Sequence, residues 1–360
     1  MQSYPIPMVP GPVKLPQKVI DAFSVNYGSA DLEPEFFELY HRTTANLQKI
    51  MGTGNSVAVL SGEGMAVLWG AMKSSIVPGE KVLAVATGLF GHGIADMAQS
   101  IGADVRKVSL PDDQTLSDTT AIEKAIDTFK PKMITAVHCE TPSGTLNPLM
   151  DLGRLKEEYH VPLLYVDAVS SIGGTPVMTD LWNIDLCLGG AQKCLSAPPD
   201  TAFLSVSESA WEIIEKVDYV GYDALKPFRD VTDKHYFPYT PNWHGLEALN
   251  AGAELILAEG LPACFERHST VASLCRRSLR EMGITLFPTH GSIPSPTVTA
   301  AYLPHGVKWE DFDARLRENG LVLGGNYGAL AGKIFRVGHM GTQADEVLVT
   351  KALNVIQTSL

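Results

Sequence analysis

The stretch that decides the fold of this chain is LCLGGAQKCLSAPP at residues 186–199. It begins as an apolar run typical of a buried strand, and two glycines end that run shortly before a single lysine, Lys193. A second apolar run, LLYVDAVSS at residues 163–171, brings Asp167 to its end in the same way. The two runs therefore predict a lysine and an aspartate at the tips of buried strands.

A lysine and an aspartate so placed suit one particular chemistry. The lysine would hold an aldehyde cofactor as a Schiff base, and the aspartate would keep a pyridine nitrogen of that cofactor protonated. Lys193 taken alone is more often an ordinary surface lysine. Its spacing from Asp167 favours the catalytic interpretation.

The composition is that of a globular protein with a large core. The chain has 360 residues, of which 45% are hydrophobic and 19% charged, and this length allows two domains. No basic run balances its formal net charge of -12, which argues against nucleic-acid and anionic-membrane partners. No window approaches the ~18 to 20 apolar residues of a membrane span.

The cysteines and the N-terminal sequence indicate a cytoplasmic protein. The first residues contain no basic region followed by an apolar stretch, so we expect no secretion signal. The cysteines are odd in number and lack metal-ligand spacing, which predicts reduced core thiols and no metal site. They are Cys139, Cys187, Cys194, Cys264 and Cys275.

Between about residues 57 and 206, short β-branched runs alternate with helix-length patterns. This alternation predicts an α/β fold whose mainly parallel sheet has helices on both faces. Such sheets bind ligands beyond the carboxyl ends of their strands. The expected strands are Val57–Leu60, Lys81–Ala86, Met133–His138, Pro162–Asp167, Asp185–Leu188 and Ala202–Val206, with helices at Asp118–Phe129 and Leu152–Tyr159 among them.

The last third of the chain has a different pattern. A loop near residues 223–240 precedes a long helical stretch, Leu246–Met282. We therefore expect a large domain with an N-terminal arm at residues 1–250 and a small α+β domain at residues 251–360. In the small domain, strand and helix patterns alternate at Thr297–Leu303, Trp309–Asn319, Lys333–Val337 and Asp345–Ser359.

Three motifs in order carry a family resemblance. They are HCETPSG at residues 138–144, VDAVSS at residues 166–171 and AQKCLSAPP at residues 191–199. With them, the chain from residue 10 to residue 341 resembles the class V, fold-type I pyridoxal-phosphate aminotransferases of the alanine–glyoxylate branch. The resemblance implies a mainly parallel sheet of seven strands, a pyridoxal-type cofactor without metal, small-molecule substrates, and a homodimer or homotetramer with shared active sites.

The resemblance also implies roles around the cofactor ring. Lys193 would form the aldimine and move a proton between substrate and cofactor, and Asp167 would pair with the ring nitrogen. Val169 and Phe90 would flank the two faces of the ring, and Thr141 would bind its phenolic oxygen. For Phe90 alone, an ordinary core position is the competing interpretation.

On the substrate side, the resemblance implies that Arg336 grips the substrate carboxylate, a role that suits its bidentate fork. The competing interpretation is a surface arginine at a strand end. The backbone near Gly11 would line the same side of the pocket.

The phosphate-binding turn departs from the family pattern. Most relatives read approximately Ser-Gly-Ser-Gly-(Thr/His) there, so that hydroxyls and backbone N–H groups hold the phosphate. This chain reads SGEGM at residues 61–65. Glu63 and Met65 replace polar donors, while Gly64 keeps the small residue.

Other contacts to the phosphate are partly kept. The family's tyrosine from the neighbouring subunit corresponds to Phe237, which lacks the hydroxyl, while Gln192 and Thr240 keep their donors. One interpretation is that the sequence of this site has changed by drift and that the site still binds phosphate through Gln192, Thr240 and backbone amides. The other is a pocket for unphosphorylated pyridoxal, because two negative charges in one partly buried cup repel strongly.

A glutamate at the turn and a phenylalanine at the cross-subunit position resemble the pyridoxamine–pyruvate aminotransferases within this family. That resemblance implies conversion of pyridoxamine and pyruvate to pyridoxal and alanine, with pyridoxal held by Lys193 as a substrate. One position departs, because a second arginine of that group falls on Tyr327. The alternative is an aminotransferase that depends on pyridoxal 5'-phosphate and uses a small amino acid with glyoxylate or pyruvate.

Two other classes of protein fit the sequence less well. A cysteine desulfurase needs a nucleophilic cysteine on a mobile loop, whereas Cys264 and Cys275 fall in the long helical stretch. A nucleotide-binding module needs a phosphate-cradling loop, and the pattern Gly-x-x-x-x-Gly-Lys-Ser/Thr does not occur in the chain.

Overall fold

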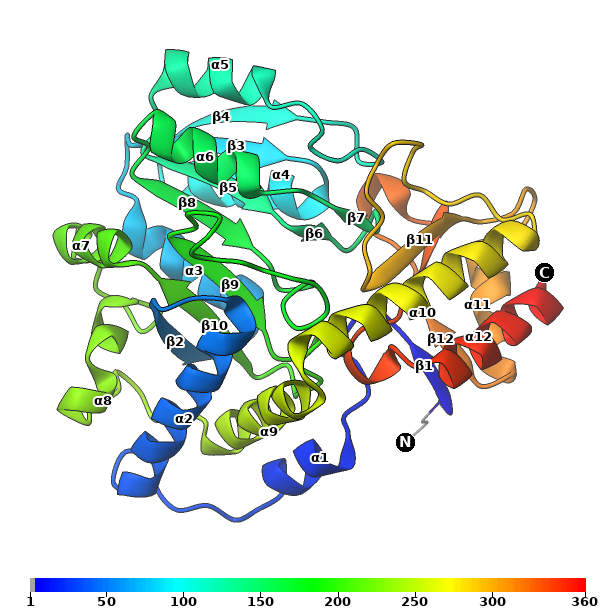
Figure 1. Cartoon of the computed structure of the whole chain (residues 1–360), viewed down its shortest axis with the longest axis horizontal. Helices are drawn as coiled ribbons and strands as arrows, with labels where there is room; N and C mark the ends of the chain where they lie inside the picture. Colours follow the sequence, from blue (N-terminus) through cyan, green and yellow to red (C-terminus); the bar gives the residue numbers. More distant parts are fainter. Residues whose placement is uncertain (1–3) are drawn as a thin grey trace.

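Seven strands form one sheet at the centre of the structure, a computed structural model that describes residues 4–360 (Figure 1). In sheet order they are β2 (Ser56–Ser61), β10 (Thr201–Val206), β9 (Leu186–Gly190), β8 (Leu163–Asp167), β5 (Met133–Val137), β3 (Lys81–Ala86) and β4 (Asp104–Ser109). β10 runs antiparallel to its neighbours β2 and β9, and the remaining neighbours pair in parallel. The expected α/β fold with a mainly parallel sheet of seven strands is confirmed.

The central strands are buried along their whole length. Every residue of β5, β8 and β9 is buried, so these strands show no alternation of polar and apolar residues. Continuous burial of this kind is typical of parallel strands covered on both faces. The edge strand β4 reads DVRKVS and exposes four of its six residues, so the sequence pattern does not predict it.

Helices pack against this sheet. α3 (Gly64–Ser75) contacts β9 and β10, α4 (Leu89–Ser100) contacts β3 and β5, and α6 (Met150–Glu158) contacts β8. No helix within residues 4–360 is both long and apolar enough to span a bilayer. The remaining elements of this part are α1 (Gln17–Phe23), α2 (Pro34–Met51), α5 (Thr120–Phe129), α7 (Glu208–Val217), α8 (Val231–Lys234), β6 (Cys139–Glu140), β7 (Thr145–Leu146) and a short 3-10 helix, Lys226–Arg229.

The helical stretch expected at Leu246–Met282 is interrupted. It consists of α9 (Trp243–Glu259) and α10 (Leu261–Glu281). Gly260 between them has φ +87°, a backbone conformation that favours glycine and cannot continue a helix. Pro262 follows in the first turn of α10, where a helix needs no N–H from it.

A second, smaller core lies beside the sheet. It contains the antiparallel pair β11 (Val298–Tyr302) and β13 (Ile334–Gly338) together with α11 (Trp309–Glu318) and α12 (Glu346–Ser359). The N-terminal strand β1 (Ile6–Met8) also belongs here, because it pairs in parallel with β12 (Leu321–Leu323) (Figure 1). Helix α10 contributes side chains to both cores, and the division of the chain at residue 250 stays a prediction.

Candidate active site

The carboxyl ends of four parallel strands, β3, β5, β8 and β9, meet at one edge of the sheet. Asp167 is the last residue of β8, and Lys193 follows the end of β9 by three residues. Phe90 lies in the first turn of α4, which follows β3, and Thr141 directly follows β6. The topology therefore brings four predicted site residues to the edge where such sheets bind ligands.

A cavity of about 260 Å³ opens at this edge. Its lining combines the N-terminal arm, two strand-to-helix connections and β13. Six predicted site residues lie on its wall: Gly11, Phe90, Thr141, Lys193, Tyr327 and Arg336.

The side chain of Lys193 lines this cavity. Its Nζ donates a hydrogen bond to the carbonyl oxygen of Pro10 at 2.6 Å, and within residues 4–360 it forms no ion pair. Burial, followed by the positive charge of Arg336, lowers the pKa of Lys193. Gly11 allows the close approach, because its φ is +91° and a Cβ there would lie 2.6 Å from Lys193 Cδ. A lysine with a lowered pKa is a better nucleophile and proton carrier at neutral pH.

Asp167 is a buried carboxylate that forms no salt bridge within residues 4–360. The side chain is 7% exposed, and its Oδ1 accepts a hydrogen bond from Val169 N at 3.0 Å. Burial, and secondly the negative charge of Glu63, raise the pKa of Asp167 to about 6. A protonated ring nitrogen would supply the missing positive charge, so the residues present fit a pyridoxal ring.

Val169 is held firmly beside the strand tips. A Cβ at Gly64 would lie 3.0 Å from Val169 Cγ2, and one at Gly190 would lie 2.9 Å from Val169 Cγ1. The two glycines thus let α3 and β9 close around this side chain. Thr141 shares a hydrogen bond of 2.5 Å between its Oγ1 and Ser170 Oγ, which fixes its hydroxyl.

Glu140 is a residue of this site that the sequence analysis does not assign. It is fully buried, and its carboxylate accepts hydrogen bonds from Gly91 N at 2.7 Å and Phe90 N at 3.1 Å. Burial raises the pKa of Glu140 to about 7. The carboxylate caps α4, whose own N-cap Gly88 has no side chain to do so, and thereby fixes Phe90 relative to Thr141. In the sequence, the signal for such a role is the start of α4 at Gly88, which has no side chain to cap the helix.

Glu63 occupies the turn between β2 and α3, where the family resemblance predicts phosphate binding. Its Oε2 accepts a hydrogen bond from Met65 N at 2.9 Å, which caps α3, and its Oε1 accepts one from Gln192 Nε2 at 2.7 Å. The chain's own carboxylate therefore uses both donors. The Oε1 atom of Gln192 is buried and has no hydrogen-bond partner within residues 4–360. A buried acceptor without a partner favours a ligand that donates a hydrogen bond, such as a hydroxyl group.

Arg336 is a nearly buried cation on the cavity wall. It is 4% exposed, its Nε donates to the carbonyl oxygen of Gly325 at 2.8 Å, and its guanidinium lies 4.8 Å from the ring centroid of Tyr327. Burial lowers the pKa of Arg336, and it forms no ion pair within the described part of the chain. A buried guanidinium without an acidic partner favours an anionic ligand such as a carboxylate.

Phe237 and Thr240 lie away from this cavity in their own chain. The ring of Phe237 is 7% exposed and packs against Phe36 and Tyr40, with ring centroids 5.5 and 5.3 Å apart. Thr240 is exposed. The single chain does not bring either residue to Lys193, and a contact to a neighbouring subunit stays a prediction.

The cysteines lack the properties of a nucleophile. All five are buried and unpaired to one another. Burial raises the pKa of Cys264 and of Cys275 to about 12, so neither thiol ionises at neutral pH. Within residues 4–360, no three His, Cys, Asp or Glu side chains gather into a metal site.

Known proteins are similar to this chain along nearly its whole length. The family model described as aminotransferase class-V matches residues 9–335. An uncharacterized aminotransferase of Methanocaldococcus jannaschii is 35% identical over 351 residues, which are 96% of this chain and 90% of that protein. A pyridoxamine–pyruvate transaminase of Mesorhizobium japonicum is 30% identical over 332 residues, 91% of this chain and 84% of that protein. The crystal structure of an alanine–glyoxylate aminotransferase from Nostoc sp. has a TM-score of 0.95 at 28% identity, covering 100% of this chain and 96% of that one.

Proposed function

The chain belongs to the class V aminotransferases of fold type I, and from this premise we propose that it transfers the amino group of free pyridoxamine to a small 2-keto acid. The expected acceptor is pyruvate, so that the products are pyridoxal and alanine. Pyridoxal is then a substrate held by Lys193 and not a permanent phosphorylated cofactor. The observation that carries the proposal is the carboxylate of Glu63 at the phosphate turn.

Glu63 disfavours a phosphate in two ways. Its hydrogen bonds already use Met65 N and Gln192 Nε2, which would otherwise hold the anion. Its negative charge would also repel a phosphate in the same partly buried turn. Free pyridoxamine carries a hydroxymethyl group at this position, and that hydroxyl can donate to Glu63 or to the unpartnered Oε1 of Gln192.

The residues at the strand tips divide the chemistry between them. A bound pyridoxal ring supplies an aldehyde carbon and an electron-withdrawing ring nitrogen. Asp167 keeps that nitrogen protonated, because within residues 4–360 its buried carboxylate accepts a hydrogen bond only from Val169 N and forms no salt bridge. The amine of Lys193, with its lowered pKa, would hold the aldehyde carbon with loss of water, and would carry a proton between that carbon and the Cα of the keto acid.

Arg336 orients the keto acid through its carboxylate. The second arginine of the pyridoxamine–pyruvate group is replaced by Tyr327, whose ring lies under the Arg336 guanidinium. One cation suits a monocarboxylate better than a dicarboxylate, because a second carboxylate would find no partner of opposite charge. Pyruvate and glyoxylate fit this condition.

A second candidate is a pyridoxal 5'-phosphate-dependent aminotransferase acting on a small amino acid and glyoxylate. The likeness to alanine–glyoxylate aminotransferases supports it, as does the retained amide of Gln192. Both candidates share the roles of Lys193, Asp167 and Arg336. We also propose a cytoplasmic homodimer or homotetramer in which the exposed Thr240 reaches the neighbouring active site.

Two measurements on the wild-type protein separate the candidates. The first is the rate of alanine formation from pyruvate with pyridoxamine as donor, compared with pyridoxamine phosphate. The second is the absorbance spectrum after dialysis. Our proposal expects turnover of free pyridoxamine and a protein that becomes yellow only when pyridoxal is added. A phosphorylated cofactor that survives dialysis, together with turnover of alanine and glyoxylate, would establish the second candidate.

A further inference from the structure

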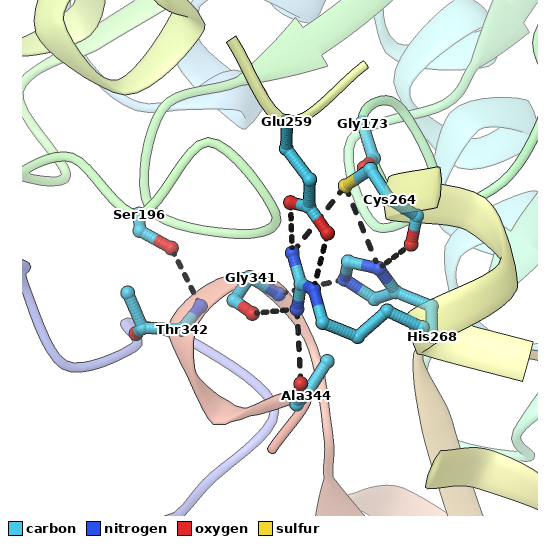
Figure 2. Close-up of polar contacts among 9 residues, drawn as sticks. Gly173, Ser196, Glu259, Cys264, His268, Gly341, Thr342 and Ala344 are labelled. Carbon is cyan, nitrogen blue, oxygen red and sulfur yellow. Dashed lines mark hydrogen bonds and ion pairs between the residues drawn. The ribbon is translucent and has the colours of Figure 1, made fainter. Parts of the chain in front are cut away.

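A polar cluster lies where the loop after Lys193 meets the segment after β13, with Ser196 and His268 buried and Arg267 and Glu259 about a third exposed (Figure 2). Its side chains come from Ser196 of that loop, from Glu259 at the end of α9, and from Arg267 and His268 of α10. None of these side chains lines the cavity that contains Lys193. Any effect of the cluster on the site is therefore transmitted through the backbone.

Gly341 packs directly on the backbone that carries Lys193. A Cβ built on Gly341 would lie 3.1 Å from the carbonyl oxygen of Lys193, 3.0 Å from that of Cys194 and 2.1 Å from Ser196 Oγ. Gly341 has φ +58°, so its backbone conformation also favours glycine. It lies five positions beyond Arg336 in the same segment. This contact gives a backbone link between the segment that carries Arg336 and the loop that carries Lys193.

Four hydrogen bonds hold this link in place (Figure 2). Thr342 N donates to Ser196 Oγ at 3.0 Å, and Gly341 N donates to His268 Nε2 at 2.9 Å. Arg267 Nη1 donates to the carbonyl oxygens of Gly341 at 3.0 Å and Ala344 at 2.9 Å. Both N–H groups and carbonyl oxygens of the segment after β13 are thus hydrogen-bonded to the cluster.

The two α10 side chains of the cluster are themselves fixed. Glu259 accepts two hydrogen bonds of 2.7 Å, one from Arg267 Nε and one from Arg267 Nη2, which sets the plane of the guanidinium. Burial lowers the pKa of His268 to about 4, so its ring is neutral at pH 7. His268 Nδ1 therefore donates to the carbonyl oxygen of Cys264 at 2.7 Å, and its Nε2 is free to accept from Gly341.

We propose that Ser196, Arg267 and His268 are positioning residues that hold Arg336 at a fixed place relative to Lys193. The proposal rests on the proposed roles of Lys193 as the aldehyde-binding amine and of Arg336 as the carboxylate-binding group. Of these two residues, binding of pyridoxal needs only Lys193, whereas transfer to a keto acid needs Lys193 and Arg336 together. A loosened cluster should therefore impair transfer and spare the binding of pyridoxal.

Two substitutions of Ser196 separate positioning from mere folding. Ser196 has φ +52°, a strained conformation for any residue except glycine. Ser196→Ala removes the hydroxyl and keeps the strain, whereas Ser196→Gly removes the hydroxyl and relieves the strain. We expect the glycine variant to melt at a higher temperature than the alanine variant. Both should lose about five- to tenfold in kcat/KM for pyruvate, the worth of one hydrogen bond.

The dissociation constant of pyridoxal is measured by absorbance on the same proteins and should stay within about twofold of the wild type. Recovery of wild-type transfer in Ser196→Gly would overturn the proposal, because activity would then follow stability. A parallel loss of pyridoxal affinity and transfer would also overturn it.

Arg267→Lys tests the other arm of the cluster. A lysine keeps the charge but has three donors on one nitrogen, so it cannot replace the four hydrogen bonds of Arg267 to Glu259 and the two carbonyl oxygens. We expect a loss of about tenfold or more in kcat/KM for pyruvate. The matched control is Arg276→Lys, which also lies in α10 and donates from Nη1 to a carbonyl oxygen, that of Ser295, at 2.9 Å. The control should stay within about twofold of the wild type. Equal losses in both variants would count against a specific role of Arg267.

Failure of the proposed function gives a different result. If the wild type ignores pyridoxamine and instead uses alanine and glyoxylate with pyridoxal 5'-phosphate, the same variants are compared with that pair of substrates. If Lys193→Ala retains transfer, the assigned role of Lys193 is wrong whatever the cluster variants show.

Discussion

Replacing Glu63 with serine is the most direct test of the unphosphorylated pocket. The carboxylate accepts hydrogen bonds from Met65 N at 2.9 Å and from Gln192 Nε2 at 2.7 Å. Serine removes the charge and releases the Gln192 amide to a ligand. Serine is also a good N-cap residue, so α3 keeps a cap and the fold should survive the change.

The size of the effect follows from the charges involved. Two unit charges about 4 Å apart repel by about 4 kcal/mol at an effective dielectric constant of about 20. Removal of that repulsion should improve the use of pyridoxamine phosphate by about a hundredfold or more. The same change removes a charged acceptor for the hydroxymethyl group, which should weaken pyridoxamine by about 1.5 to 3 kcal/mol. The preference between the two donors should therefore reverse or nearly reverse.

The assay is kcat/KM for pyridoxamine and for pyridoxamine phosphate, with pyruvate as acceptor, in the wild type and in two variants. Glu63→Gln is the matched control, because it removes the charge while it keeps the length of the side chain. Its preference should fall between those of the wild type and Glu63→Ser. Equal use of both donors by the wild type, or an unchanged ratio in Glu63→Ser, would refute the reasoning.

Four further predictions concern other residues. Lys193→Ala should abolish transfer, because no other lysine within residues 4–360 lines the cavity at the strand ends; a borohydride-trapped pyridoxal adduct on the variant would contradict this. Glu140→Gln should weaken pyridoxal binding by about 1 to 3 kcal/mol, because one amide oxygen cannot accept from both Phe90 N and Gly91 N. An absorbance titration measures this, and an unchanged affinity would show that Glu140 does not position the site. Burial lowers the pKa of His268 to about 4 in the folded protein, so as pH falls the histidine is protonated in the unfolded chain before it is protonated in the folded one. The free energy of unfolding should therefore fall as pH drops from about 6.5 toward 4, and this residue should contribute at most about 3 kcal/mol to the fall. His268→Gln should flatten that dependence in denaturant titrations, and an identical slope would disprove the assignment. Mixing inactive Lys193→Ala with an inactive Thr240 variant should restore part of the activity if active sites are shared between subunits, whereas a fully active monomer in sedimentation would exclude sharing.

The sheet and the tips of its strands could be predicted because their signals are local. The apolar runs of β5, β8 and β9 are complete within a few residues, and each ends at a glycine, an aspartate or a histidine. β4 was not predicted because it is an edge strand, whose exposed positions carry charged residues in place of an apolar run. The pairing of β1 with β12 depends on residues far apart in sequence, which no local pattern records.

The site could be predicted in part for the same reason. Lys193 and Asp167 follow from the strands that carry them. The role of Glu140 depends on α4 approaching it in space, and that of Gly341 depends on its contact with the Lys193 loop. The burial of Phe237 against Phe36 likewise comes from tertiary packing that its own short motif does not encode.

The pairing of β1 with β12 also constrains how the protein can be made. Ile6 pairs with Leu321, which the ribosome adds 321 - 6 = 315 residues later, or roughly 15 to 60 s at typical rates of synthesis. Once Val206 has been added the large sheet has all its strands, but β1 has no strand to pair with until β12 is made. The carbonyl of Pro10, which receives the hydrogen bond from Lys193, lies on the same N-terminal arm. We therefore expect nascent chains stalled before Leu321 to hold a folded sheet with an unfinished active site, so that the enzyme becomes active only when its small core closes on its own first residues.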